Sequence, residues 1–100
     1  MKIENKETEI EKKINKDGGK LKYSDLLKEV IENPPKGGFI GVDEMKKRIR
    51  MTTAIECESN GVIEFETGDL DSIKKLINEF GWGVLHKDIL NFINYINSIK

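Results

Sequence analysis

Clusters of helix-breaking residues divide this chain into short segments, and they limit its possible folds more than any other feature does. A proline pushes the preceding residue out of the helical region, and Asn-Gly or Gly-rich pairs favour the left-handed turn that ends a helix. The clusters lie at 17–19, 34–38, 60–61 and 81–83. After residue 20 we therefore expect short helices, at 24–33, 43–59, 70–80 and from 87 to the C-terminus.

Short stretches between these helices are typical of strands. Val62–Glu66 alternates apolar and acidic side chains, which predicts a strand with one face in the core. Phe39–Val42 is long enough for a second strand, and Gly83–Leu85 for a third. The sequence therefore predicts an α+β, mainly helical fold of about four helices with a small two- or three-stranded sheet.

The first twenty residues are rich in charge and poor in apolar side chains. They contain six Lys and five Asp or Glu, and their aliphatic residues beyond Met1 are Ile3, Ile10 and Ile14. Three aliphatic side chains do not offset the entropy of ordering twenty residues. We therefore expect a flexible charged arm at 1–20 and a single globular domain at 21–100. A helix with the three isoleucines on one face, docked on a partner or sister subunit, stays open as an alternative.

The length of the chain favours a binding module over an enzyme. One hundred residues form one domain at most, with a modest core and little room for a deep active site. The formal net charge of −1 argues against a partner that is recognised by overall charge. Because no stretch carries a specific catalytic or cofactor motif, we expect no enzymatic activity and no cofactor.

The residues that commonly bind metals are too few or wrongly spaced for a metal site. Cys57 is the only cysteine, which excludes an intramolecular disulfide and a zinc cluster and fits a buried position in a cytoplasmic protein. His86 is the only histidine and would satisfy backbone groups at the start of the last helix. The carboxylates between 64 and 71 lack the alternating ladder of a calcium loop. We expect no metal.

No segment of the sequence resembles a targeting or membrane-spanning element. The N-terminus lacks the apolar run of a secretory signal peptide. No other segment approaches the roughly 18 apolar residues of a membrane span. We therefore expect a cytoplasmic protein without membrane association.

A separated charge pattern makes the second helix the most promising binding surface. Four cations lie between 46 and 50, no Lys or Arg follows until Lys74, and six carboxylates fall in that gap. On a helical projection Lys46, Lys47 and Arg50 share one face, opposite a stripe that we expect to be buried. That stripe consists of Met45, Ile49, Thr52 and Ile55. The basic face fits a phosphate or an acidic protein, although an ordinary solvated helix surface has the same composition.

Arg48 lies beside this expected apolar stripe, where a solvated cation is out of place. Glu56 intrudes on the same stripe from its other edge. A buried or interfacial ion pair that involves these two residues is therefore the sharpest local prediction. Their partners can belong to another element or to another chain.

Two turns are further candidates for binding. Lys36 lies among prolines and glycines as in a phosphate loop, but the spacing of that motif and its preceding strand are missing, so a simple connector is favoured. Trp82 lies between two glycines and is either a core residue at a chain reversal or an exposed contact for a partner. Of these two roles we expect burial in the core.

The last helix is apolar over more than half of its surface. Its polar stripe is narrow and consists of Asn91, Asn94 and Ser98. A helix this apolar is central or shared between subunits, so we expect a homo-oligomer, most simply a dimer. The expected interface residues are Glu56, Phe92, Tyr95, Ile96 and Ile99.

The segment Pro35–Phe39, followed by Asp43–Arg50, resembles a pattern found in small, mostly uncharacterised proteins of tailed phages and prophages. The resemblance covers the general layout of residues 21–99, and its specific positions lie between 35 and 50. It implies a phage accessory protein that binds or inhibits a host or defence component in the cytoplasm of the host cell.

These observations favour non-catalytic binding of a protein partner, through the basic helix and any apolar surface that the last helix exposes. Two other functions stay open. In the first, Lys46, Arg48 and Arg50 line a subunit interface that sequesters a small anionic ligand such as a nucleotide. In the second, the same cations make a local contact with nucleic acid.

Overall fold

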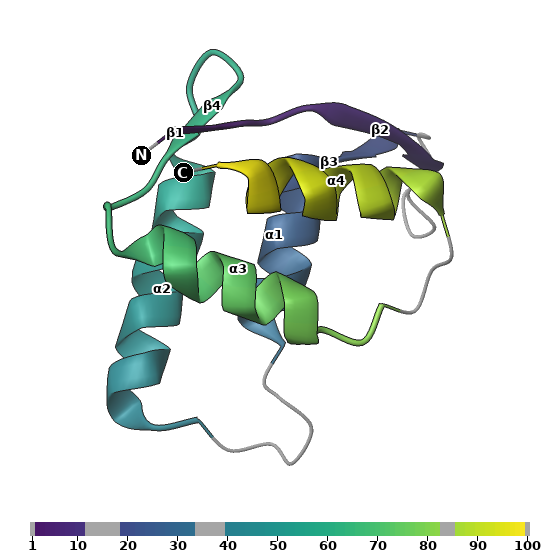
Figure 1. Cartoon of the computed structure of the whole chain (residues 1–100). Helices are drawn as coiled ribbons and strands as arrows, with labels where there is room; N and C mark the ends of the chain where they lie inside the picture. Colours follow the sequence, from purple (N-terminus) through teal and green to yellow (C-terminus); the bar gives the residue numbers. More distant parts are fainter. Residues whose placement is uncertain (1, 12–18, 34–39, 83–85, 100) are drawn as a thin grey trace.

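The computed structural model describes residues 2–11, 19–33, 40–82 and 86–99, which form four helices and two small antiparallel sheets (Figure 1). The helices are α1 (Tyr23–Glu32), α2 (Val42–Glu56), α3 (Asp69–Glu79) and α4 (Lys87–Ser98). The strands are β1 (Lys2–Glu4), β2 (Glu7–Glu11), β3 (Lys20–Lys22) and β4 (Val62–Glu64). The predicted mainly helical α+β fold is confirmed.

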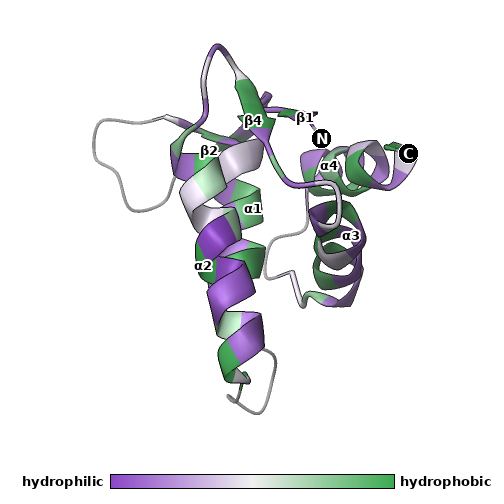
Figure 2. Ribbon diagram, turned by 90° about the vertical axis from the view of Figure 1, so that its left-hand side faces the viewer, coloured by the Kyte–Doolittle hydropathy of each residue, from purple (hydrophilic) through white to green (hydrophobic). Residues whose placement is uncertain are grey.

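The helices form two pairs that cross one another. The helices α1 and α2 run side by side, and α3 and α4 form a second pair that lies across the first (Figures 1 and 2). The N-terminal strands run along α4, and β2 contacts that helix directly (Figure 1). The apolar stripes of the helices meet between the pairs, so the core lies at their crossing.

The helices end close to the breaks in the sequence. The helix α1 ends at Glu32, just before the first proline, and α3 ends at Glu79, just before the glycines around Trp82. After α2 the chain turns through Asn60 and Gly61, which both have positive φ angles, of 53° and 76°. These boundaries follow from local backbone chemistry and agree with the predictions to within a few residues.

Two local expectations around α2 are wrong. Val42 is the first residue of this helix, with Gly41 as its N-cap, and does not end a strand at 39–42. At the other end the helix stops at Glu56, three residues before the predicted end, so that Cys57 caps it and is exposed where burial was expected. Lys36, Phe39 and the possible strand at 83–85 lie outside the described residues.

Residues 2–11 are ordered strands, which corrects the prediction of a flexible arm for this part of the chain. In β1, Ile3 is paired with Ile63 of β4 and is fully buried. In β2, Ile10 is 7% exposed, and the strand pairs antiparallel with β3. The apolar side chains of this segment alone do not offset its ordering entropy. The strands β3 and β4 supply hydrogen-bonding partners for its backbone, and the helices supply apolar contacts for its isoleucines. Residues 12–18 lie outside the described part.

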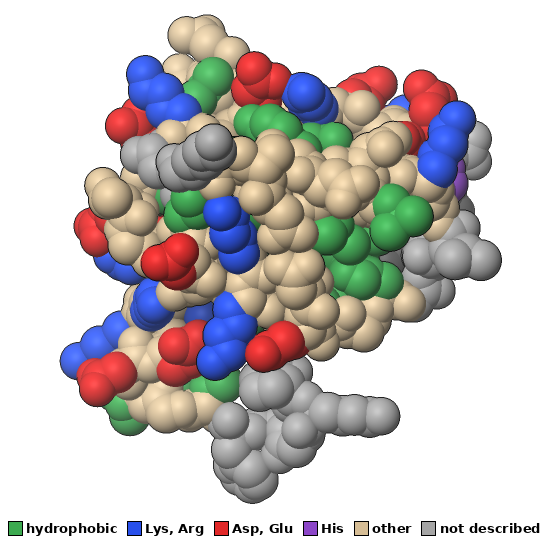
Figure 3. Space-filling view, in the orientation of Figure 1, with side chains coloured by type: hydrophobic (Ala, Val, Ile, Leu, Met, Phe, Trp, Pro, Cys, Tyr) green, Lys and Arg blue, Asp and Glu red, His purple; other side chains and the backbone are tan. Residues whose placement is uncertain are grey.

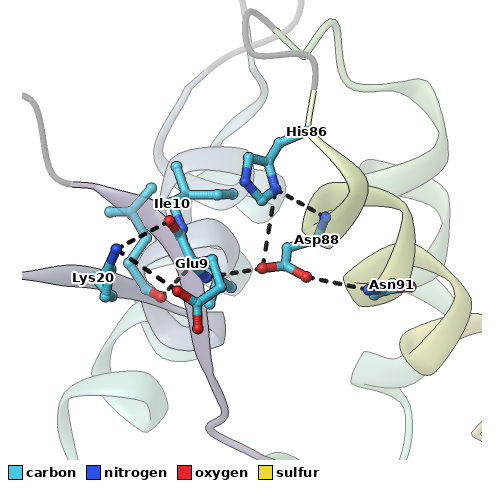
Figure 4. A network of polar contacts seen from close by, with 8 residues as sticks. Glu9, Ile10, Lys20, His86, Asp88 and Asn91 are labelled. Atoms are coloured by element: carbon cyan, nitrogen blue, oxygen red, sulfur yellow. Dashed lines mark hydrogen bonds and ion pairs between the residues drawn. The ribbon is translucent and has the colours of Figure 1, made fainter.

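Side chains of α4 also hold the N-terminal strands in place (Figure 4). The backbone N–H of Glu9 donates a hydrogen bond of 2.8 Å to Oδ2 of Asp88, and the Asn91 side chain donates one of 3.1 Å to Oδ1. His86 caps α4, because its Nδ1 accepts a hydrogen bond of 3.0 Å from the Asp88 N–H. The hydrogen bond from Glu9, and after it that from Asn91, lowers the pKa of Asp88 below its ordinary value. Because its pKa is lowered, the ionised Asp88 carboxylate stabilises the folded state. This stabilisation is fully present above the ordinary Asp pKa and is lost as the pH falls through the lowered pKa of Asp88.

The apolar surface of α4 is covered within the chain itself. Phe92 and Ile96 are fully buried, and the ring of Phe92 packs edge-on against Tyr23 at 4.9 Å between centroids. Tyr95 and Ile99 are half-buried against the same core, and the Tyr95 hydroxyl accepts a hydrogen bond of 2.9 Å from the N–H of Glu4. The prediction of a subunit interface at Phe92 and Ile96 is therefore wrong, because the N-terminal strands and α1 occupy the place expected for a second subunit.

Candidate functional site

The helix α2 is rotated relative to the orientation predicted from its sequence. Its buried residues are Arg48, Met51 and Ile55, whereas Met45 is 46% exposed and Ile49 is 60% exposed. The spacing of Arg48, Met51 and Ile55 is also helical, at three and seven residues, so the sequence contains two competing faces. Packing against α1 and β4 selects the face that contains the arginine.

The Arg48 guanidinium binds the C-terminal end of α1. Its Nη1 donates hydrogen bonds of 3.2 Å to the carbonyl oxygens of Ile31 and Asn33, and its Nε donates one of 3.1 Å to Glu44. The last carbonyls of a helix lack partners within the helix, so a cation there satisfies them and opposes the negative end of the helix dipole. Arg48 is therefore a structural residue that joins α1 to α2.

The predicted ion pair between Arg48 and Glu56 is absent. Glu56 instead lies 3.5 Å from the ammonium of Lys28 on α1, and its side chain is more than half exposed. Arg48 is buried, one of the two placements left open, but its partners are mainly backbone carbonyls. A projection of one helix shows which side chains share a face, and cannot show which neighbouring helix ends there.

Replacing Arg48 is expected to lower the stability of the protein. In Arg48→Met the aliphatic stem keeps its packing, but two carbonyls at the end of α1 lose their donor, and we expect a loss of about 2 kcal/mol in the free energy of unfolding. Urea denaturation followed by circular dichroism measures this change. The matched control is Lys46→Met on the exposed side of α2, which should change stability by less than about 0.5 kcal/mol. Equal stabilities of the two variants would contradict this role.

Arg50, one of the four cations between 46 and 50, pairs with two of the carboxylates that follow them in the sequence. Its guanidinium contacts the carboxylates of Glu66 and of Asp69, which lie before and at the start of α3. Asp69 is buried, and its Oδ2 also accepts a hydrogen bond of 3.3 Å from the Glu66 N–H. The hydrogen bond that Arg50 donates to Glu66 raises the pKa of Arg50 above its ordinary value, so the guanidinium stays charged. Some of the charges that are separated in the sequence therefore pair with each other in the fold, where they join α2 to the start of α3.

The apolar side chains that α2 exposes define what we call the α2 outer face. It consists of Val42, Met45 and Ile49, and Lys46 lies directly beside them on the helix. Val42 is 68% exposed, and among the described residues neither Lys46 nor Lys47 has an ion-pair partner. Figures 1 and 2 show that the N-terminal half of α2 extends beyond the rest of the helix bundle, which leaves this face uncovered.

The α2 outer face was not predicted as an exposed surface. The sequence argument placed Met45 and Ile49 in the core and assigned Val42 to a strand. The signal that was available is the second helical spacing of Arg48, Met51 and Ile55, which competes with the stripe that contains Met45 and Ile49. Of the predicted basic face, Arg50 contacts carboxylates within the fold, and Lys46 alone borders the exposed apolar residues. Arg48, predicted beside the apolar stripe, is also used within the fold.

Trp82 lies at a second site, between α3 and α4, and is half-buried. Its ring packs edge-on against Phe80 at 4.8 Å and Phe92 at 6.1 Å, and its Nε1 donates a hydrogen bond of 3.4 Å to the Ile77 carbonyl. The expected burial of Trp82 in the core is met only in part, because the ring packs against core residues but stays half-exposed. Its exposed part borders a pocket, considered below.

Neither metal-binding clusters nor membrane-spanning helices occur in the described part of the chain. No group of three or more His, Cys, Asp or Glu side chains there has a metal-binding arrangement. Each of the described helices is too short or too polar to cross a membrane. No protein-family model matches the chain, and no curated protein or solved structure is significantly similar to it. A function must therefore be argued from the geometry alone.

Proposed function

We propose that this chain is a non-catalytic binding protein that inserts the α2 outer face into an apolar groove of a protein partner. The observation that carries the proposal is the exposure of Val42, Met45 and Ile49 on one side of a projecting helix. Their spacing of three and seven residues is the one with which amphipathic helices occupy grooves on other proteins. Contiguous exposed apolar side chains on a small monomer are typical of interaction sites.

Lys46 indicates the charge of the groove that would fit. It lies four residues after Val42, and among the described residues no carboxylate pairs with it. A carboxylate at the rim of the partner's groove would pair with this ammonium, and such charge complementarity adds specificity and association rate. The proposed partner therefore presents an apolar groove with an acidic rim. A host component, as the resemblance to phage accessory proteins implies, would be one such partner.

The alternatives based on anion binding are less well supported. They require Lys46, Arg48 and Arg50 to act together on a nucleotide or a nucleic acid. Arg48 instead points to the end of α1, and Arg50 contacts two carboxylates. A phosphate at this helix would therefore meet Lys46 and the half-buried Lys47, with Asp43 and Glu44 in the preceding turn.

The test compares two exposed positions on different helices. Tagged wild-type chain, Ile49→Glu and Leu90→Glu are used to capture proteins from the cells in which the protein is made, and the recovered proteins are quantified by mass spectrometry. Leu90 is 63% exposed on α4 and makes a matched control, because the same change is made away from α2. With a recovered partner in purified form, Ile49→Glu should weaken binding by about tenfold or more, and Leu90→Glu should leave it unchanged.

Two results would contradict the proposal. The first is equal recovery of every captured protein by wild type and Ile49→Glu, since a carboxylate in an apolar groove carries a desolvation cost. The second is self-association through the same face, seen in sedimentation velocity as a dimer that Ile49→Glu converts to a monomer. Circular dichroism checks that both variants are folded, which we expect because both positions are exposed.

A further inference from the structure

A separate pocket of about 420 Å³ lies between α1, α4 and the segment after α3 and shares no residue with the α2 outer face. Figure 3 shows apolar side chains at the surface between the end of α3 and the start of α4. Its lining comes from β2, β3, α1, α4 and the segment after α3, and comprises Ile10, Leu21, Asp25, Leu26, Glu29, Phe80, Gly81, Trp82 and Ile89. Pockets that bind small molecules have volumes of about 300 to 1,000 Å³.

The body of the pocket is apolar and aromatic. Leu26 and Ile89 are buried, at 4% and 6% exposure, and they belong to the core, so this part of the wall is held firmly. Phe80 and Trp82 add two rings packed edge-on at 4.8 Å. The indole N–H of Trp82 is bonded to the Ile77 carbonyl, so the ring offers mainly its hydrocarbon and π surface to a ligand.

Among the described residues of the lining, the charged ones are Asp25 and Glu29, and both are acidic. Asp25 and Glu29 are four residues apart on α1 and therefore lie on the same side of the helix. One oxygen of Asp25 accepts a hydrogen bond of 2.8 Å from the Lys22 N–H and so fixes the start of α1. Among the described residues, no cation pairs with the Glu29 carboxylate. The rim of the pocket is thus negative on one side and aromatic on another.

We infer that this pocket binds a small organic monocation that consists of an apolar body and one ammonium group. The apolar body occupies the space between Leu26, Ile89 and Trp82, where it is removed from water. The ammonium lies at the rim, attracted by the Glu29 carboxylate and by the negative face of an aromatic ring. A carboxylate or phosphate ligand of the same shape is excluded, because the acidic rim repels it.

Trp82 is the only tryptophan of the chain, so its fluorescence reports directly on occupation of the pocket. The probes are n-hexylammonium, 1-hexanol and hexanoate, which share an apolar body and differ in charge. We expect a saturable change in emission with n-hexylammonium, at least about fivefold weaker binding of 1-hexanol and no saturable binding of hexanoate. Equal affinity for the amine and the alcohol, or no saturable change with the amine up to about 20 mM, would overturn the inference.

A pair of variants on α1 tests the role of the carboxylate. Glu29→Gln should weaken n-hexylammonium binding by about fivefold, with the Trp82 signal retained at saturation. Glu32→Gln is the matched control, because Glu32 is exposed on the same helix and does not line the pocket, and its affinity should equal that of the wild type. An equal loss of n-hexylammonium affinity in both variants would indicate a long-range charge effect. It would overturn the assignment of the ammonium site to Glu29.

One further probe distinguishes a free amine from a side chain of a peptide. Nα-acetyl-lysine amide carries the same ammonium on a shorter alkyl chain and adds two peptide groups. Because the pocket body is apolar, we expect this probe to bind more weakly than n-hexylammonium. Tighter binding of the lysine derivative would overturn the assignment to a small organic ligand in favour of a peptide.

Discussion

Replacing Ile3 by asparagine is expected to lower the free energy of unfolding by about 4 kcal/mol, because it removes buried apolar contacts and buries an amide without partners. Ile3 is fully buried in β1 and faces Ile63 of β4. A domain of this size has a total stability of roughly 5 to 15 kcal/mol, so the variant would be close to unfolding. Urea denaturation monitored by circular dichroism and by Trp82 fluorescence measures the loss.

The control for Ile3 is the same replacement at the neighbouring residue. Lys2 is exposed on the other face of β1, opposite Glu64, and Lys2→Asn should cost less than about 1 kcal/mol. The comparison separates the ordered strand from a flexible arm. In an arm the two replacements would have equally small effects, and this result would contradict the buried position of Ile3.

Replacing Phe92 by alanine is expected to destabilise the protein by about 3 to 5 kcal/mol, the cost of a large cavity in a core. Phe92 is fully buried where α4 meets α1, and its ring contacts those of Tyr23 and Trp82. The variant also removes edge-on aromatic contacts, which are worth about 0.5 to 1.5 kcal/mol beyond their buried area. Thermal and urea unfolding both measure the effect.

The concentration dependence of this loss distinguishes a core residue from an interface residue. If Phe92 packs inside its own chain, the difference in stability between wild type and Phe92→Ala is the same at all protein concentrations. Leu90→Ala on the exposed side of α4 is the control and should change stability by less than about 0.5 kcal/mol. A loss that grows with protein concentration would restore the predicted role of Phe92 in a subunit interface.

The helices were predictable because their signals are local. Residues 70–80 place their apolar side chains in one arc, and α3 buries Leu70, Ile73 and Ile77 as that arc requires. The breaks at Pro34 and around Trp82 act through the backbone of neighbouring residues, and α1 and α3 end just before them.

The candidate sites were less predictable because they depend on contacts between distant segments. The α2 outer face is exposed because Arg48 reaches the carbonyls at the end of α1, and that helix end is not visible in the sequence of α2. The pocket beside Trp82 is assembled from four separate segments of the chain, and Glu29 lines it only through its position on α1. Lys46 was predicted to be part of a basic binding face, but its apolar neighbours were assigned to the core.

The sequence by itself determined the number of the helices, their approximate limits and the α+β class. Those properties follow from periodicity and backbone preference over a few residues. Only the tertiary structure decided that residues 2–11 are strands, that α4 is covered within the chain and which face α2 presents. The reason is that the two apolar faces of α2 have similar local free energies, as do the ordered and flexible states of the N-terminal segment. Contacts between residues far apart in the sequence then select one of each.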